Sequence, residues 1–190
     1  ADDIYPVNPT MINYLGSGRV NSFAAVSQTL PAPKVKSLTG LPAQGTSTQD
    51  DITTFQLAFN QVMDPTSMNN LNHSELRSAG PNNTFGDGDD VLYPLNASGT
   101  YRIGTNALDY NIVGGPLPCG SYRLTVFAGG VKNPFDTPLD GDGNGSGGDH
   151  FIREFSISPN LYVDADNDGY GTGAPVTGVL GCVPPAGYSL

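Results

Sequence analysis

Tryptophan is absent from the 190-residue chain and basic residues are few, with 8 Lys and Arg against 18 Asp and Glu and a net charge of -10. Nucleic-acid binding rests on Lys and Arg contacts to phosphate, so this balance argues against a nucleic-acid partner. It also disfavours attachment to an anionic membrane surface. No apolar run in the sequence is long enough for a membrane-spanning helix, so membrane insertion is not expected.

Glutamate, histidine and cysteine are scarce as well. Sixteen of the 18 acids are Asp, a short residue that suits turns and is a frequent Ca²⁺ ligand in loops, although a salt-adapted surface shows the same bias. No Cys or His pair has the spacing of a zinc site. The two cysteines, Cys119 and Cys182, leave two alternatives, one disulfide in an oxidising compartment or two free thiols.

The sequence contains no recognisable catalytic constellation. There is no GxSxG motif to hold a serine nucleophile on a sharp turn. His150 follows Asp149, which raises a catalytic or zinc role, but an isolated loop histidine is the favoured interpretation. Two carboxylates together can hydrolyse glycosides, yet here the carboxylates lie in Gly-rich turns that hold such a pair poorly. We therefore expect a protein that is not an enzyme.

Helical periodicity is nearly absent, and short segments with alternating apolar and polar residues recur instead. Gly, Pro, Asn and Asp bound these segments, as expected for strands. The predicted strands cover residues 33–40, 52–63, 74–80, 90–96, 100–106, 107–113, 120–129 and 150–158. One apolar and one polar face per strand predict an all-β antiparallel sandwich. Asp64–Leu71 is either a short helical turn opened by Asp-Pro or a loop between strands.

Three segments follow from this pattern. Residues 33–158 are the predicted sandwich. Residues 1–32 contain two expected strands joined at GSG, which pack on the sandwich, belong to an upstream domain or pair with another subunit. Residues 159–190 hold too few apolar residues for a core of their own. The first residues, ADDIYPVNPT, show no signal peptide and are typical of a mature or trimmed end.

An Asp-rich loop, DADNDGYG, has the sharpest physical interpretation. Asp164, Asp166 and Asp168 occupy positions 1, 3 and 5 and a glycine follows, as in the first half of a calcium loop. Tyr170 at position 7 would offer its backbone carbonyl. Position 12 is Pro175 rather than a bidentate Glu, so the loop is not an EF-hand and its ion needs further ligands. The alternative is a solvated Asp/Gly turn.

A second loop, LDGDGNGSGGDHF, repeats this spacing. Asp140, Asp142 and Asn144 occupy positions 1, 3 and 5, a glycine stands at position 6, and Asp149 comes at position 10. We predict a second Ca²⁺ site here, with a polar hairpin between two strands as the alternative. A third acidic loop, TFGDGDDV, is a weaker metal candidate, because adjacent acids also serve only to turn the chain. Its acids are Asp87, Asp89 and Asp90.

The stretch from APKVKSLTG to FIREFSIS resembles bacterial immunoglobulin-like domains, which occur in tandem in large secreted and cell-surface proteins. The resemblance rests on PKVKSLTGLPAQG, FQLAFNQVMDPTSM, AGPNNTFGDGDDV and the long run GPLPCGSYRLTVFAGGVKNPFDTPLDGDGNGSGGDHFIREFSI. It covers about two thirds of the chain. It implies an immunoglobulin-like antiparallel β-sandwich with N- and C-terminal extensions.

The tail LYVDADNDGYGTGAPVTGVLGCVPPAGYSL resembles the calcium-binding Asp repeats of bacterial surface proteins, which are similar to thrombospondin type 3 repeats. In such repeats a second Asp/Cys cluster follows, and this chain stops at Leu190 before it. The resemblance therefore implies a fragment or processed product of a longer protein. Cys182 would lack its local partner, which leaves a bridge to Cys119 open.

Together these features predict an extracellular or cell-surface module, stabilised by Ca²⁺, in a surface layer, adhesin or extracellular filament. The expected partners are other copies or domains of the assembly, and in a filament residues 1–32 would complete a neighbour's sheet by strand addition. The alternative is a carbohydrate-binding accessory domain of a secreted enzyme, with glycans as partners. Nine tyrosines are available for its aromatic platform, whereas the absence of Trp counts against it.

Overall fold

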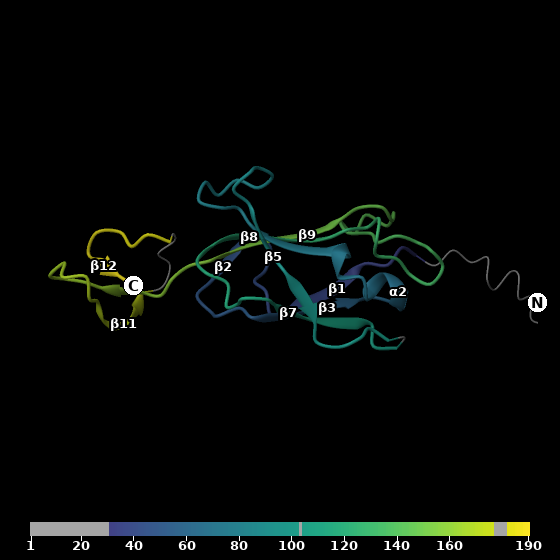
Figure 1. The fold of residues 1–190 in the computed structure, drawn as a ribbon, viewed down its shortest axis with the longest axis horizontal. Coiled ribbons are helices and arrows are strands. Elements are labelled where there is room, and N and C mark those ends of the chain that lie inside the picture. Colours follow the sequence, from purple (N-terminus) through teal and green to yellow (C-terminus); the bar gives the residue numbers. More distant parts are fainter. Residues whose placement is uncertain (1–30, 103, 177–181) are drawn as a thin grey trace, which may run out of the picture. The chain divides into compact units, whose positions relative to one another are not determined.

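The computed structural model describes residues 31–102, 104–176 and 182–190 (Figure 1). The chain divides into two compact units, residues 1–31 and residues 32–190, and only the second is described below. The two strands expected near the N-terminus lie outside the described residues. Within the described ranges, no helix is long and apolar enough to cross a membrane.

Two sheets face each other in the sandwich (Figure 1). The four-stranded sheet is antiparallel throughout, in the order β1 (Val35–Thr39), β3 (Thr54–Phe59), β7 (Ala107–Ile112) and β6 (Leu95–Ala97). The five-stranded sheet has the order β2 (Thr46–Thr48), β9 (Phe151–Ile157), β8 (Gly120–Val126), β4 (Ser74–Ser78) and β5 (Val91–Tyr93). The prediction of an all-β sandwich is confirmed. The antiparallel prediction fails at one edge, where β2 runs parallel to β9.

The strand order is that of immunoglobulin-type sandwiches. There, strands A, B, E and D form one sheet, and C, F and G form the other. In chain order, β1, β3, β6 and β7 take the places of A, B, D and E, and β4, β8 and β9 take those of C, F and G. The short β2 and β5 extend the second sheet at its two edges.

Alternating side chains of the central strands fill the space between the sheets. In β3, Phe55, Leu57 and Phe59 point inward and are at most 3% exposed. Phe55 stacks on Tyr110 of the neighbouring β7 at 4.8 Å between ring centroids. Such period-two burial explains why these segments are recognisable from the sequence, because each strand has one apolar and one polar face.

Tyr122, near the start of β8, makes a tyrosine corner. It is 1% exposed, and its hydroxyl donates to the carbonyl of Pro118, four residues earlier, at 2.5 Å. This contact ties the chain entering β8 to the core, and the same corner occurs in immunoglobulin-type sandwiches. Burial raises the pKa of the Tyr122 hydroxyl well above its usual value, so the group stays a neutral donor.

Replacing Tyr122 by Phe is expected to lower the free energy of unfolding by about 2 kcal/mol, because the Pro118 carbonyl loses its donor. Urea denaturation measures this change. Tyr170→Phe is the matched control, because that side chain is 80% exposed and its loss of a hydroxyl should leave stability unchanged. Equal stability of Tyr122→Phe and the parent protein would contradict the structural role of the corner.

Two strand predictions are wrong. In residues 90–96, Pro94 divides one expected strand into β5 and β6, which belong to different sheets, because proline has no N–H for a ladder hydrogen bond and its ring fixes φ. The described residues of 100–106 contain no strand. Tyr101 points into the core instead, where its hydroxyl accepts from Met63 N at 3.0 Å, and its own N–H donates to Asn69 at 2.8 Å.

The Asp-Pro segment between β3 and β4 is helical. Helix α2 (Pro65–Met68) begins after Asp64, whose carboxylate accepts from Ser67 N at 2.8 Å. A single 3₁₀ turn, η2 (Leu71–His73), follows. Of the two alternatives for this segment, the short helical turn is therefore the one observed.

The tail forms a small antiparallel sheet in the order β11 (Thr172–Val176), β10 (Leu161–Val163) and β12 (Tyr188–Ser189). Among its described residues, Leu161 is the only apolar side chain that is fully buried. The Gln49 side chain of the β2–β3 connection donates to the carbonyls of Pro159 and Val176 at 3.2 and 3.3 Å. With so little apolar burial, the tail depends on such contacts and on the disulfide between Cys119 and Cys182.

Candidate metal centres

The Asp140 loop is organised around one buried carboxylate. Asp140 is 2% exposed, and its two carboxylate oxygens accept from Gly143 N at 2.8 Å and from Gly145 N at 3.0 Å. Gly145 has φ +97°, a conformation that favours glycine. The side chain at position 1 therefore holds the loop in shape, and glycine permits the sharp turn at position 6.

The other acids of this loop converge on Asp140. One carboxylate oxygen from each of Asp140, Asp142 and Asp149 lies within 4.8 Å of the others. The sheet-like bridge between Asp140 and Asp149, with Gly141 N donating to Asp149 O at 3.0 Å, brings position 10 back to position 1. None of the described salt bridges involves these three acids, so their repulsion has no cationic side chain to offset it.

The side chain of Asn144, at position 5 of this loop, makes hydrogen bonds within the loop. Its side-chain N–H donates to Asp142 at 3.0 Å, and its side-chain oxygen accepts from Ser146 N at 2.7 Å. The amide thus braces the loop and shields Asp142. Its role as a metal ligand stays a prediction.

The tail loop repeats the design. Asp164 is 5% exposed, and its carboxylate accepts from Asp168 N at 3.2 Å and from Gly169 N at 3.0 Å. One carboxylate oxygen from each of Asp164, Asp166 and Asp168 lies within 4.8 Å of the others. Tyr170 N donates to Asp168 at 2.9 Å while the tyrosine ring is exposed. That the backbone carbonyl of Tyr170 binds the ion also stays a prediction.

Both loops offer the same donor chemistry. Each gathers two further carboxylates around an aspartate that is fixed by backbone N–H groups. Oxygen-only donors in a flexible loop suit Ca²⁺, which takes 6–8 oxygens, whereas zinc sites use nitrogen and sulfur. The residues present therefore fit calcium, with the remaining positions left to backbone carbonyls and water.

The third acidic group, between β4 and β5, is built differently. The Asn82 side chain donates to both Asp87 and Asp89, at 2.7 and 3.0 Å, and Gly86 N donates to Asp90 at 2.8 Å. A carboxyl–carboxyl hydrogen bond with Asp87 raises the pKa of Asp89, and the same contact lowers the pKa of Asp87. The group is exposed or half-buried and lacks the buried position-1 carboxylate. The bridging role of Asn82 has no signal in the sequence.

Both histidines make structural contacts. His150 packs edge-to-face on Phe127 at 5.2 Å, and its Nδ1 accepts from Ala128 N at 3.2 Å. His73 Nδ1 lies 2.9 Å from the carbonyl oxygen of Ser67. These contacts hold loops next to the sandwich.

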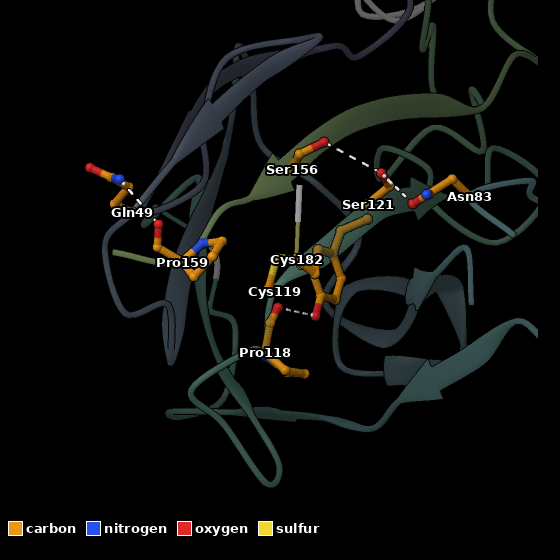
Figure 2. Close-up of a disulfide and its surroundings, with 9 residues drawn as sticks. Gln49, Asn83, Pro118, Cys119, Ser121, Ser156, Pro159 and Cys182 are labelled. Carbon is orange, nitrogen blue, oxygen red and sulfur yellow. Dashed lines mark hydrogen bonds between the residues drawn. A yellow bond between two sulfur atoms is a disulfide. The ribbon is translucent and has the colours of Figure 1, made fainter. Parts of the chain in front are cut away.

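Cys119 and Cys182 form a disulfide (Figure 2). Their Cα atoms are 5.5 Å apart, and 63 positions separate them in the sequence. Cys119 immediately precedes β8, while Cys182 belongs to the tail. The bond therefore fastens the tail to the strand that also carries the tyrosine corner.

No protein-family model matches the chain, and a search of curated proteins gave no match. Among solved structures, the chain is similar to PcoC, a methionine-rich copper resistance protein from Escherichia coli (TM-score 0.43, 12% identity, 66% of this chain and 97% of that one). It is also similar to the N-terminal part of the bacterial S-layer protein SbsC (0.38, 14%, 75% and 28%) and to CopC from Methylosinus trichosporium OB3b (0.39, 14%, 67% and 94%). At these values the comparisons carry no argument about ligands or partners.

Proposed function

We propose that the chain is a calcium-stabilised structural module of an extracellular or cell-surface assembly. One observation carries the proposal: two separate loops share a buried position-1 aspartate, a position-6 glycine and three converging carboxylates. The disulfide supports the location, because such bonds persist in oxidising compartments outside the cytosol. No sequence motif of catalysis competes with this role.

Each ion would bind a loop that is hydrogen-bonded to a distant segment of the chain. Asp140 N donates to Pro33 O at 2.7 Å, so the Asp140 loop is fastened to the chain just before β1. Asp164 N donates to Gly187 O at 2.9 Å, which connects the tail loop to the turn before β12. Bound Ca²⁺ would offset the repulsion among three carboxylates in each loop. It would thereby fix the entry to the sandwich and the fold of the tail.

Calcium titration calorimetry tests the sites directly. We expect two ions per chain, and one ion after either Asp149→Asn or Asp166→Asn, because each substitution removes one carboxylate ligand. Neither side chain makes a described hydrogen bond that its loss would break. Asp51→Asn, on an exposed residue, is the charge-matched control and should keep both ions. Unchanged stoichiometry in both loop variants would contradict the assignment.

The assembly partner is proposed to be a second copy or a neighbouring domain. Sedimentation of the full chain should then show larger species as concentration rises, with calcium present. A chain beginning at residue 33 should remain monomeric if the N-terminal segment completes a neighbour's sheet. A monomeric full chain at all concentrations would refute self-assembly.

A further inference from the structure

Small-ligand sites are cavities of about 300 to 1,000 Å³, and a cavity of about 740 Å³ lies beside the disulfide. Residues of β2, β8 and β9, the connection after β4, and the tail residues Cys182 and Val183 line it. Neither predicted calcium loop takes part. The cavity is therefore separate from the metal centres.

The floor of this cavity is a row of serines across three strands. Ser47 of β2 is opposite Ser156 of β9, which is opposite Ser121 of β8. Residues opposite each other in register share a face of the sheet. Ser121 Oγ lies 3.5 Å from Ser156 Oγ and donates to Asn83 Oδ1 at 3.1 Å, as Figure 2 shows. The floor thus offers small side chains with both donors and acceptors.

The walls are apolar. Pro81, of the connection after β4, and Pro118, just before β8, line the cavity. The disulfide between Cys119 and Cys182 also lines it, on the side of the tail. Val183, next to Cys182, is 81% exposed. A ligand seated here would meet hydroxyls below and apolar surfaces at its sides, the combination that orients small polar ligands in pockets.

None of the lining residues is Asp, Glu, Lys, Arg or His, although the chain has a net charge of -10. A charged ligand would find no counter-ion in this cavity and would lose solvation on entering it. An anion would also be repelled by the acidic chain. The lining therefore favours an uncharged ligand.

The serine row runs across β2, β9 and β8 rather than along one strand. A peptide that adds a strand must run along an unpaired edge, and of these three strands only the edge strand β2 has one. Recognition along the serine row must therefore come from side chains.

We propose that this cavity binds an uncharged saccharide. Saccharide hydroxyls both donate and accept, which suits Ser47, Ser121, Ser156 and Asn83, while the C–H faces of the ring suit the proline and disulfide walls. The site gives the module a ligand in addition to its proposed structural role. No acidic loop lines it, so its ligand contacts are separate from the metal centres.

Titration calorimetry of the full chain with uncharged cello-, xylo-, manno- and malto-oligosaccharides tests the proposal. At least one series should bind, and Ser47→Tyr should weaken that binding by about tenfold or more, because the ring fills the cavity. Ser37→Tyr is the matched control: Ser37 is an exposed serine on an edge strand of the other sheet, and its variant should bind as the parent does.

Three results would overturn the saccharide site: no binding by any uncharged series, equal binding by Ser47→Tyr and Ser37→Tyr, or binding only of anionic polymers such as alginate. Calcium stoichiometry is measured on the same Ser47→Tyr protein. If both ions remain while saccharide binding is lost, the cavity and the metal centres are separate. Failure of the saccharide test with two ions bound would leave the calcium proposal intact.

Discussion

Excess chelator is expected to lower the free energy of unfolding by about 3 kcal/mol for each occupied loop, when free Ca²⁺ had been about a hundredfold above its Kd. A ligand that binds only the folded state stabilises it by mass action. The carboxylates of Asp140, Asp142 and Asp149 also repel one another once the ion is gone. Thermal unfolding followed by circular dichroism, with and without EGTA, measures the effect as a lower Tm.

The control for chelation is a protein that carries Asp149→Asn and Asp166→Asn together. It should melt at the same temperature with or without EGTA, because both loops have lost a ligand. Magnesium should restore less stability than calcium, since Mg²⁺ demands a tighter octahedral geometry and keeps its water. A parent melting curve that does not move in excess chelator would rule out calcium as a stabiliser.

The second large effect concerns the disulfide. Replacing both Cys119 and Cys182 by Ser is expected to destabilise the protein by about 4 kcal/mol, the chain-entropy value for closing a loop of 63 positions. The double substitution avoids a lone thiol that would dimerise. Since the tail has only Leu161 as a fully buried apolar side chain among its described residues, the loss should fall mainly on the tail.

Limited proteolysis, together with denaturant unfolding curves, distinguishes loss of the tail from loss of the sandwich. We expect cleavage after the sandwich in the Cys→Ser variant while the core of residues 33–158 persists. Reduction and alkylation of the parent should produce the same pattern. If the variant resists protease as well as the oxidised parent does, the Gln49 contacts to Pro159 and Val176 hold the tail without the covalent bond.

Sequence patterns predicted the central strands well and the edges poorly. β3 and β8 alternate apolar and polar residues because one face packs in the core. β2, Thr46–Thr48, has no such alternation, although it pairs with β9 at the edge of the sheet. Tyr101 produced a false strand, because an aromatic residue anchored by hydrogen bonds to Met63 and Asn69 looks the same in sequence as one in a sheet.

In the candidate metal centres, too, the sequence predicted one part of the arrangement and not another. Spacing placed Asp164, Asp166 and Asp168 together, because residues close in sequence meet in a turn. It could not decide how position 1 is held, since the backbone donors to Asp140 and Asp164 depend on loop conformation. The serine row has no local pattern at all: it arises from the register of three strands that are distant in the chain.

The covalent link between Cys119 and Cys182 also changes how the protein would transmit mechanical load. A pull applied between β1 and the residues after Cys182 passes through the sulfur atoms and bypasses the backbone of residues 120–181. The loops of Asp140 and Asp164 both lie in that bypassed section. While the bond is intact, about 220 Å of contour length is withheld from stretching, so tension can open the remaining strands without extending the chain of either candidate calcium loop.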